Sequence, residues 1–134
     1  MKTRLAMLFV LASAFVVPTF ARTYPFVTDH TVPGATGSVA THFDKNGNTI
    51  VMLKVDRLAK PSELTPPGNI YIVWFQQQGQ PPEKEGQLVV NNKLKGELET
   101  TTMLKNFKVF VTSETDPTAN APSGQQVLQT TVQD

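Results

Sequence analysis

Short apolar runs separated by polar turns fill most of the chain after residue 36. Apolar and polar side chains alternate within these runs, as they do in a strand with one buried face. Val51, Leu53 and Val55 show the pattern, because they share one face of the run Thr49–Leu58. No comparable stretch shows the 3.6-residue period of an amphipathic helix. The pattern therefore predicts an all-β fold.

Seven strands are predicted, at intervals of about 8–12 residues that are typical of a β-sandwich. Their ranges are Ser38–Phe43, Thr49–Leu58, Ile70–Gln77, Gln87–Val90, Lys93–Thr102, Phe107–Ser113 and Gln125–Val132. The third strand is apolar on both faces until Gln76, which marks it as a central strand. We expect a seven-stranded, immunoglobulin-like β-sandwich with mostly antiparallel pairing.

The connections carry recognisable turn residues. Asn46-Gly47 is a strong hairpin signal, because both residue types adopt positive φ at low cost. Asn91-Asn92 favours a second hairpin, in which Leu94 and Leu98 would face the core. Prolines occur between the apolar runs and not within them, as a sheet requires. One helical turn is expected at Pro61–Leu64, in the connection after the second strand.

The first 21 residues have the features of a secretory signal peptide. Lys2 and Arg4 precede an apolar stretch, and small residues stand at Thr19 and Ala21, where a signal peptidase needs them. An uncleaved anchor is the alternative, but a helix over residues 5–21 spans only about 25 Å of a ~30 Å hydrocarbon core. The prediction is an exported protein, periplasmic or extracellular, without a membrane span after cleavage.

This prediction divides the chain into three parts: a signal peptide (1–21), an extended lead-in (22–36) and a β-sandwich domain (37–134). Composition narrows the function of that domain. The formal net charge is +1 and basic residues are scattered, which argues against a nucleic-acid partner. Cysteine is absent, so disulfides, thiolate metal sites and a cysteine nucleophile are excluded.

Polar residues give few candidates for a metal or catalytic site. The only histidines, His30 and His42, could ligate a metal together with Asp29, Asp44 or Met52, but they lack ligand spacing. Glu114 and Asp116 could hold calcium or act as an acid–base pair, although a solvated loop explains them equally. Neither a nucleophile elbow nor a phosphate-binding glycine loop is present. We expect no enzyme activity, no metal and no cofactor.

The aromatic residues of the apolar runs predict the structural core. Trp74 is the only tryptophan, and Val73 and Phe75 flank it on the central strand. This setting favours a ring packed between the sheets over an exposed platform for a sugar or peptide. The expected core residues are Tyr71, Trp74, Phe107, Val109 and Val111.

Two ordered blocks of residues resemble the C-terminal domain of anti-sigma-K factors. The first block comprises Tyr71-Ile72-Val73-Trp74, Gly79, Pro81, Gly86 and Leu88. The second comprises Phe107, Val111-Thr112, Glu114, Pro122, Gly124, Val127 and Leu128. The resemblance implies an extracytoplasmic β-sandwich, and at Glu114 it favours a structural role such as accepting backbone hydrogen bonds. It does not extend to sigma-factor binding, because the cytoplasmic domain of that family has no counterpart here.

The expected function is a non-catalytic extracytoplasmic binding or sensing module. Its partner would be a protein or a cell-envelope ligand, and the alternative is a secreted carbohydrate-binding or surface-assembly protein. A small sandwich has little room for a deep pocket, so a loop is the expected binding site. The candidate loop residues are Gln76, Gln77, Gln78, Gln80, Glu83 and Lys84. Pro81-Pro82 would limit the entropy lost when this loop binds.

Cleavage after Ala21 gives a direct test of the predicted export. The exported protein should have the intact mass of a chain that begins at Arg22, because Thr19 and Ala21 fit the peptidase site. Mass spectrometry of the secreted fraction checks this. Recovery of the full-length chain in washed membranes would contradict it and favour the anchor.

Overall fold

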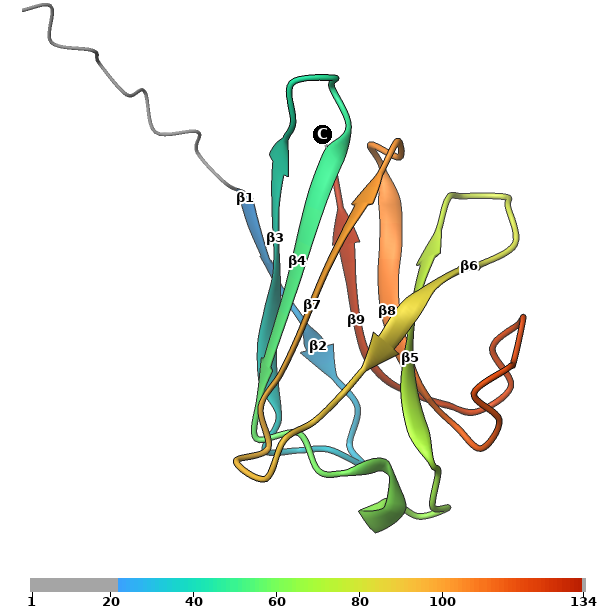
Figure 1. The fold of residues 1–134 in the computed structure, drawn as a ribbon. Coiled ribbons are helices and arrows are strands. Elements are labelled where there is room, and N and C mark those ends of the chain that lie inside the picture. Colours follow the sequence, from blue (N-terminus) through green and yellow to red (C-terminus); the bar gives the residue numbers. More distant parts are fainter. Residues whose placement is uncertain (1–21, 134) are drawn as a thin grey trace, which may run out of the picture.

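The structure is a computed structural model that describes residues 22–133; the predicted signal peptide lies outside them. Nine strands form two antiparallel sheets that face each other (Figure 1). The strands are β1 (Arg22–Pro25), β2 (Val27–Thr28), β3 (Thr36–Phe43), β4 (Thr49–Asp56), β5 (Ile70–Gln76), β6 (Glu83–Leu88), β7 (Gly96–Thr102), β8 (Phe107–Glu114) and β9 (Gln125–Val132). The first sheet has the order β1-β3-β4-β7 and the second β2-β9-β8-β5-β6. The only helix within 22–133 is the 3-10 turn η1 (Pro61–Glu63), where one turn was predicted.

The count exceeds the expected seven because the predicted lead-in contributes β1 and β2. β1 pairs with β3 in the first sheet, whereas β2 pairs with β9 in the second. The chain changes sheets at Pro25 and Phe26, and the Phe26 amide donates to the Gly37 carbonyl over 3.0 Å. One short segment therefore covers an edge of each sheet. Its prolines and lack of alternation concealed these strands in the sequence.

The predicted hairpin around Asn91-Asn92 is wrong. β6 begins at Glu83 and pairs with β5, while β7 pairs with β4, so the connection crosses from one sheet to the other. The turn itself exists, because the Asn91 side-chain oxygen accepts from the backbone amides of Lys93 and Lys95. Leu94 lies in this turn with φ 61° and not on a strand. The polar sequence at the start of β6 gave no strand signal, because β6 is an edge strand.

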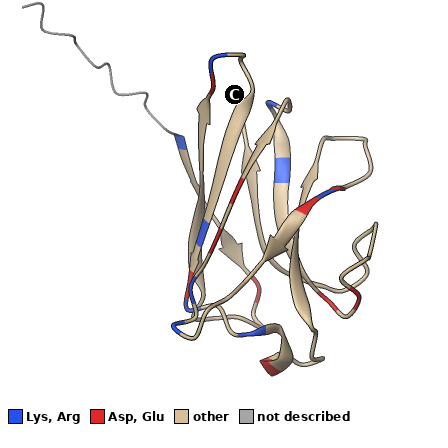
Figure 2. Cartoon of the chain, in the orientation of Figure 1, with Lys and Arg blue, Asp and Glu red and all other residues tan. Residues whose placement is uncertain are grey.

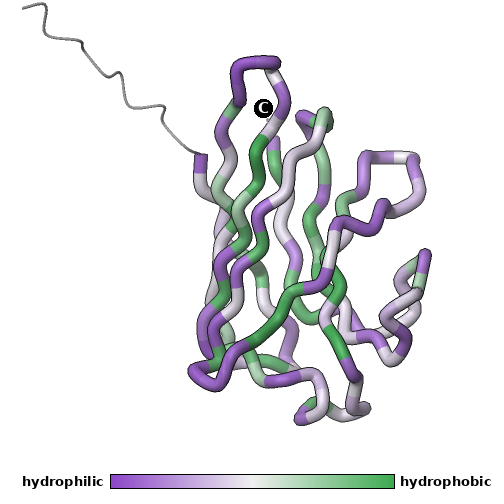
Figure 3. Tube along the Cα trace, viewed as in Figure 1, coloured by the Kyte–Doolittle hydropathy of each residue, from purple (hydrophilic) through white to green (hydrophobic). Residues whose placement is uncertain are grey.

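The core lies between the sheets and draws on nearly every strand. Val51, Leu53 and Val55 of β4 are buried there, as the alternation predicted. Opposite them lie Tyr71 of β5 and Val109 of β8. Figure 3 shows the same division along the chain, with apolar residues on the strands and hydrophilic residues in most connections. The two inner faces thus interleave as expected for packed sheets.

A second apolar cluster lies on the outer face of the second sheet. Successive side chains of β5 alternate, so that Ile72 and Trp74 point away from the core and pack against Phe110 of β8. The loop that joins β8 to β9 lies over this face, and its Ala119 packs against the cluster (Figure 1). Trp74 is completely buried, but under this loop and not between the sheets as the sequence suggested.

Charged residues are spread over both sheets and the connections (Figure 2). Figure 2 shows no face on which Lys and Arg gather, which agrees with the balanced composition. Among residues 22–133 no helix is long and apolar enough to cross a membrane.

Burial of Trp74 predicts a large contribution to stability. Trp74→Ala should lower the free energy of unfolding by about 3–5 kcal/mol, because it leaves a cavity beneath the β8–β9 loop. Urea denaturation measures the loss. Phe43→Ala is the matched control and should cost about 1 kcal/mol or less, because this ring is 52% exposed. Equal denaturation midpoints for wild type and Trp74→Ala would contradict the burial.

Candidate functional site

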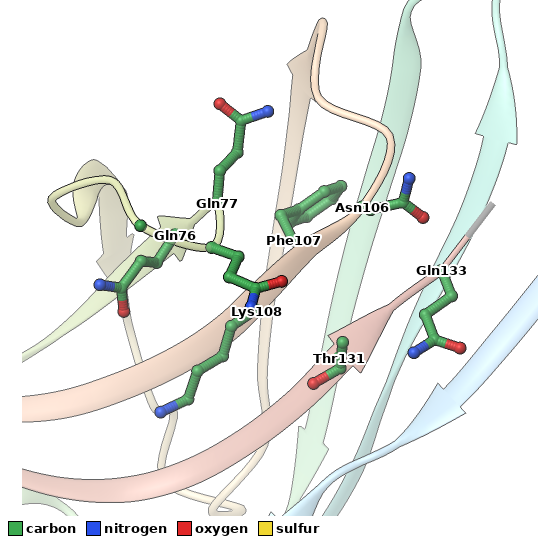
Figure 4. Close-up of a pocket in the computed structure, with 9 residues that line it drawn as sticks. Gln76, Gln77, Asn106, Phe107, Lys108, Thr131 and Gln133 are labelled. Carbon is green, nitrogen blue, oxygen red and sulfur yellow. The ribbon is translucent and has the colours of Figure 1, made fainter.

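A hollow of about 460 Å³ opens where β5 ends, at the end of the sandwich that carries the β5–β6 turn (Figure 4). We call it the amide hollow, because side-chain amides dominate its lining. Its residues are Gln76, Gln77, Gln78, Gly79, Asn106, Phe107, Lys108, Thr131 and Gln133.

The floor of the hollow is a row across three strands. Gln76 of β5 stands opposite Lys108 of β8, which in turn stands opposite Thr131 of β9. Residues opposite each other in a sheet point to the same face, so these three side chains lie together on the outer face. The pairing register of the strands therefore brings together three side chains that are far apart in the sequence.

The β5–β6 turn forms one wall. The Gln80 amide donates to the Gln77 carbonyl over 3.1 Å, and Gln76 Nε2 donates to the Gln80 carbonyl over 3.0 Å. Gly79 has φ 78°, a conformation that glycine adopts without strain. These contacts fix the turn, while the side chains of Gln77 and Gln78 remain exposed.

Among residues 22–133, the lining of the hollow contains one charged side chain, that of Lys108, and no carboxylate. The Lys108 ammonium lies 4.9 Å from the centre of the Phe110 ring and 3.3 Å from Gln126 Oε1. Both partners are neutral, and no carboxylate of the described chain lies within ion-pair distance of it. The Lys108 ammonium thus lies beside two residues, Phe110 and Gln126, that do not line the hollow.

The predicted loop residues divide between two places. Gln76, Gln77 and Gln78 line the hollow, and Gln80 holds the turn. Glu83 and Lys84 lie on β6, outside the hollow, and Lys84 Nζ donates to the Pro117 carbonyl over 2.6 Å. Sequence reasoning missed four lining residues, Asn106, Lys108, Thr131 and Gln133. Strand register brings Lys108 and Thr131 to the site, while Asn106 precedes β8 and Gln133 follows β9.

At the end of β8 that lies away from the hollow, Glu114 holds the β8–β9 loop in place over the second apolar cluster. Its carboxylate is 1% exposed and accepts hydrogen bonds from the Ser123 amide, the Ser123 hydroxyl and the Gly124 amide at 2.8–3.1 Å. Burial acts to raise the pKa of Glu114, but hydrogen bonds from Thr112, Ser123 and Gly124 outweigh it and lower the pKa. The carboxylate is therefore ionised, and its hydrogen bonds to Ser123 and Gly124 hold the β8–β9 loop. We call these hydrogen bonds the clamp.

A chain of hydrogen bonds connects the Glu114 clamp to the second apolar cluster. Trp74 Nε1 donates to Thr112 Oγ1 over 2.8 Å, and the Thr112 side chain is in turn hydrogen-bonded to Glu114. Gly124 completes the arrangement, since a Cβ there would collide with the Ser113 carbonyl oxygen and would lie 2.9 Å from Glu114 Oε2. Only glycine lets the loop backbone approach the carboxylate this closely.

The candidate metal and acid–base residues have other partners. Asp116 accepts from the amide and hydroxyl of Thr118 at 2.8 and 2.7 Å, which is a turn and not a ligand set. His30 pairs with the adjacent Asp29 at 3.0 Å, and His42 lies on β3. Between residues 22 and 133, no three His, Asp or Glu side chains gather as a metal site would need. The structure does not bring these residues together.

Comparison with known proteins identifies no relative of this chain. No family model, no curated protein and no solved structure matches the chain.

Loss of the Glu114 charge predicts a pH-dependent loss of stability. Glu114→Gln should lower the free energy of unfolding at pH 7 by about 1–3 kcal/mol, because charge-assisted hydrogen bonds are lost. The folded-state pKa is lowered, so the contribution is present above about pH 4.3, the unfolded value, and disappears as pH falls through the folded value. Urea denaturation at pH 7 and pH 3 tests both statements.

Glu97→Gln on β7 is the control for this experiment, because Glu97 is exposed and should contribute little at either pH. A Glu114→Gln deficit that is as large at pH 3 as at pH 7 would argue against the ionised clamp.

Proposed function

We propose that this chain is a non-catalytic extracytoplasmic binding or sensing module whose binding site is the amide hollow. The observation that carries the proposal is a concave site at one end of the second sheet, lined mainly by side-chain amides. Rigid elements that present a few converging polar groups are typical of ligand sites. The partner is a protein or a cell-envelope ligand.

Strand order supports the immunoglobulin-like part of this proposal. The order β9-β8-β5-β6 has the arrangement of the G, F, C and C′ strands of a variable-type domain. The strands β3, β4 and β7 form the opposing sheet, with β1 and β2 divided between the two sheets. Loops at the ends of such sandwiches are common binding sites.

The resemblance to anti-sigma-K C-terminal domains is also supported by where the matching residues lie. Tyr71, Trp74 and Glu114 are buried and hydrogen-bonded, the last as the clamp of the β8–β9 loop. The quoted motifs thus fall on residues that build the fold. The proposed compartment follows from the predicted signal peptide and the same resemblance.

Absence of catalysis is part of the proposal. Among residues 22–133, the polar groups that line the hollow are one lysine, several amides and a hydroxyl, without a carboxylate or histidine that could exchange protons near neutral pH. Amides and hydroxyls position a ligand through hydrogen bonds and leave it unchanged.

The alternative is a secreted carbohydrate-binding or surface-assembly protein, and the amide-rich lining favours it. Side-chain amides can both donate to and accept from sugar hydroxyls. Sugar sites gain much of their affinity from an exposed aromatic face, however. Phe107, the one aromatic residue that lines the hollow within the described part of the chain, is only 2% exposed. We therefore place this function second.

Crosslinking in whole cells tests the proposed site. A photoreactive residue at Gln78 should give a specific adduct, because this side chain is exposed beside the hollow. Lys93 is the control position, since it is exposed in the β6–β7 connection at the opposite end of the sandwich (Figure 1). Adducts that are absent at both positions, or equally strong at both, would remove the hollow as the binding site.

A further inference from the structure

β7 forms one edge of the first sheet, on the side away from β1. It pairs along its whole length with β4, and no strand of residues 22–133 pairs with its other side. Proline, lysine and bulges are common devices that stop an edge strand from pairing with another chain. β7 contains neither proline nor lysine, and its pairing has no register shift. β6, the edge strand of the second sheet, has both a lysine and a register shift.

The hydrogen-bond pattern of the first sheet shows which backbone groups of β7 face its open edge. The Asp44 amide donates to the Asn48 carbonyl over 2.9 Å and closes the β3–β4 hairpin. Bonded and non-bonded pairs alternate in an antiparallel ladder, so the even-numbered residues of β4 bond to β3 and its odd-numbered residues bond to β7. On β7 the even-numbered residues receive these bonds. The amides and carbonyls of Glu97, Glu99 and Thr101 therefore point to the open edge.

The side chains of the same three residues are exposed on the outer face of the sheet. Glu97 stands opposite Lys54 of β4, whereas Glu99 stands opposite the uncharged Met52. Within the described part of the chain, neither carboxylate has a hydrogen-bond or ion-pair partner. Figure 2 shows these acidic positions along β7. A strand that is added to this edge would thus meet negative charge on the outer face, most of all at Glu99.

Another carboxylate lies on the inner side of the same edge. Glu85 of β6 is hydrogen-bonded to the side chain of Thr100, which points inward from β7. Burial and the neighbouring Glu83 raise the pKa of Glu85 by more than this hydrogen bond lowers it. A cationic side chain beside Glu85 would offset the unfavourable burial of its charge. Acidic side chains therefore flank the open edge on both of its faces.

We propose that the open edge of β7 binds an extended basic polypeptide segment, which adds as an antiparallel strand and places lysine or arginine side chains opposite Glu97 and Glu99. Exposed edges bind extended segments by backbone pairing, and alternate side chains select the partner. A second copy of this chain fits less well, because two β7 strands paired over their full length would place their Glu99 side chains opposite each other. The edge belongs to the first sheet and the amide hollow to the second, so this inference does not depend on the proposed site.

The probe is a fluorescent eight-residue peptide of alternating lysine and valine, titrated into the protein purified from cells that express the full chain. Anisotropy should show binding. A peptide with the same lysines and valines in two separate blocks has the same charge but cannot present every lysine on one face of a strand. It should bind at least about tenfold more weakly, a difference of about 1.4 kcal/mol. Equal binding of the two peptides, or no binding of the alternating one, would overturn the inference.

Substitutions on β7 locate the binding site. Glu99→Gln should weaken binding about three- to fivefold, the loss expected for one exposed ion pair. Glu63→Gln, at an exposed acidic residue of η1, is the matched control and should leave binding unchanged. Thr101→Pro removes an amide that faces the open edge and keeps the pairing with β4, so it should weaken binding about tenfold in a folded protein. Unchanged affinity in both β7 variants would refute the site.

N-methylation of the peptide backbone tests strand addition without altering the protein. If the lysines stand opposite Glu97 and Glu99 in an antiparallel pair, their amides face β7 and the valine amides face away. Methyl groups on the lysine amides should therefore abolish binding, whereas those on the valine amides should be tolerated. Equal tolerance of both sets, or the reverse pattern, would overturn the inference. Self-association of the chain that Glu99→Gln strengthens would identify a second copy as the occupant and would also overturn it.

Discussion

Burial of β5 on both of its faces is the constraint on which the rest of the structure depends. Five consecutive residues of this strand, Tyr71 to Phe75, are buried. A strand in a two-layer sandwich normally exposes one of its faces to water. The opposing sheet packs against the inner face only, so the apolar side chains on the outer face of β5 need another segment to cover them. The β8–β9 loop supplies it. The fold is in this sense a sandwich with a partial third layer.

That third layer explains the polar residues beneath it. A loop laid over a sheet buries backbone amides that must find acceptors, and an ionised carboxylate can accept several at once. Glu114 has this role, at the end of β8 where the loop begins and close to where it returns at Gly124. Lys84 holds the other side of the loop by donating a hydrogen bond to the Pro117 carbonyl. The resemblance pointed to a backbone acceptor at Glu114, but without the loop's path its purpose was not visible.

Alternation and turn chemistry predicted the strands that are apolar on one or both faces, and little else. β3, β4, β5, β8 and β9 follow the apolar runs closely, because hydrophobic periodicity reports burial. β1, β2 and β6 are edge segments in which Leu88 is the one fully buried residue, so they show little of the hydrophobic alternation that marks a strand. Three glutamines of the hollow were predicted as a loop site. Lys108 and Thr131 were not, since their proximity is a property of register.

The position of the hollow follows from where the third layer stops. Apolar side chains occupy the outer face as far as Trp74 and Phe110, and the loop covers them. At the next outward-facing positions of the two strands, Gln76 and Lys108 take their place, and these polar side chains need no apolar cover. A polar floor and a turn fixed by its own hydrogen bonds thus lie together at one end of the sheet, beyond the part of the outer face that the loop covers.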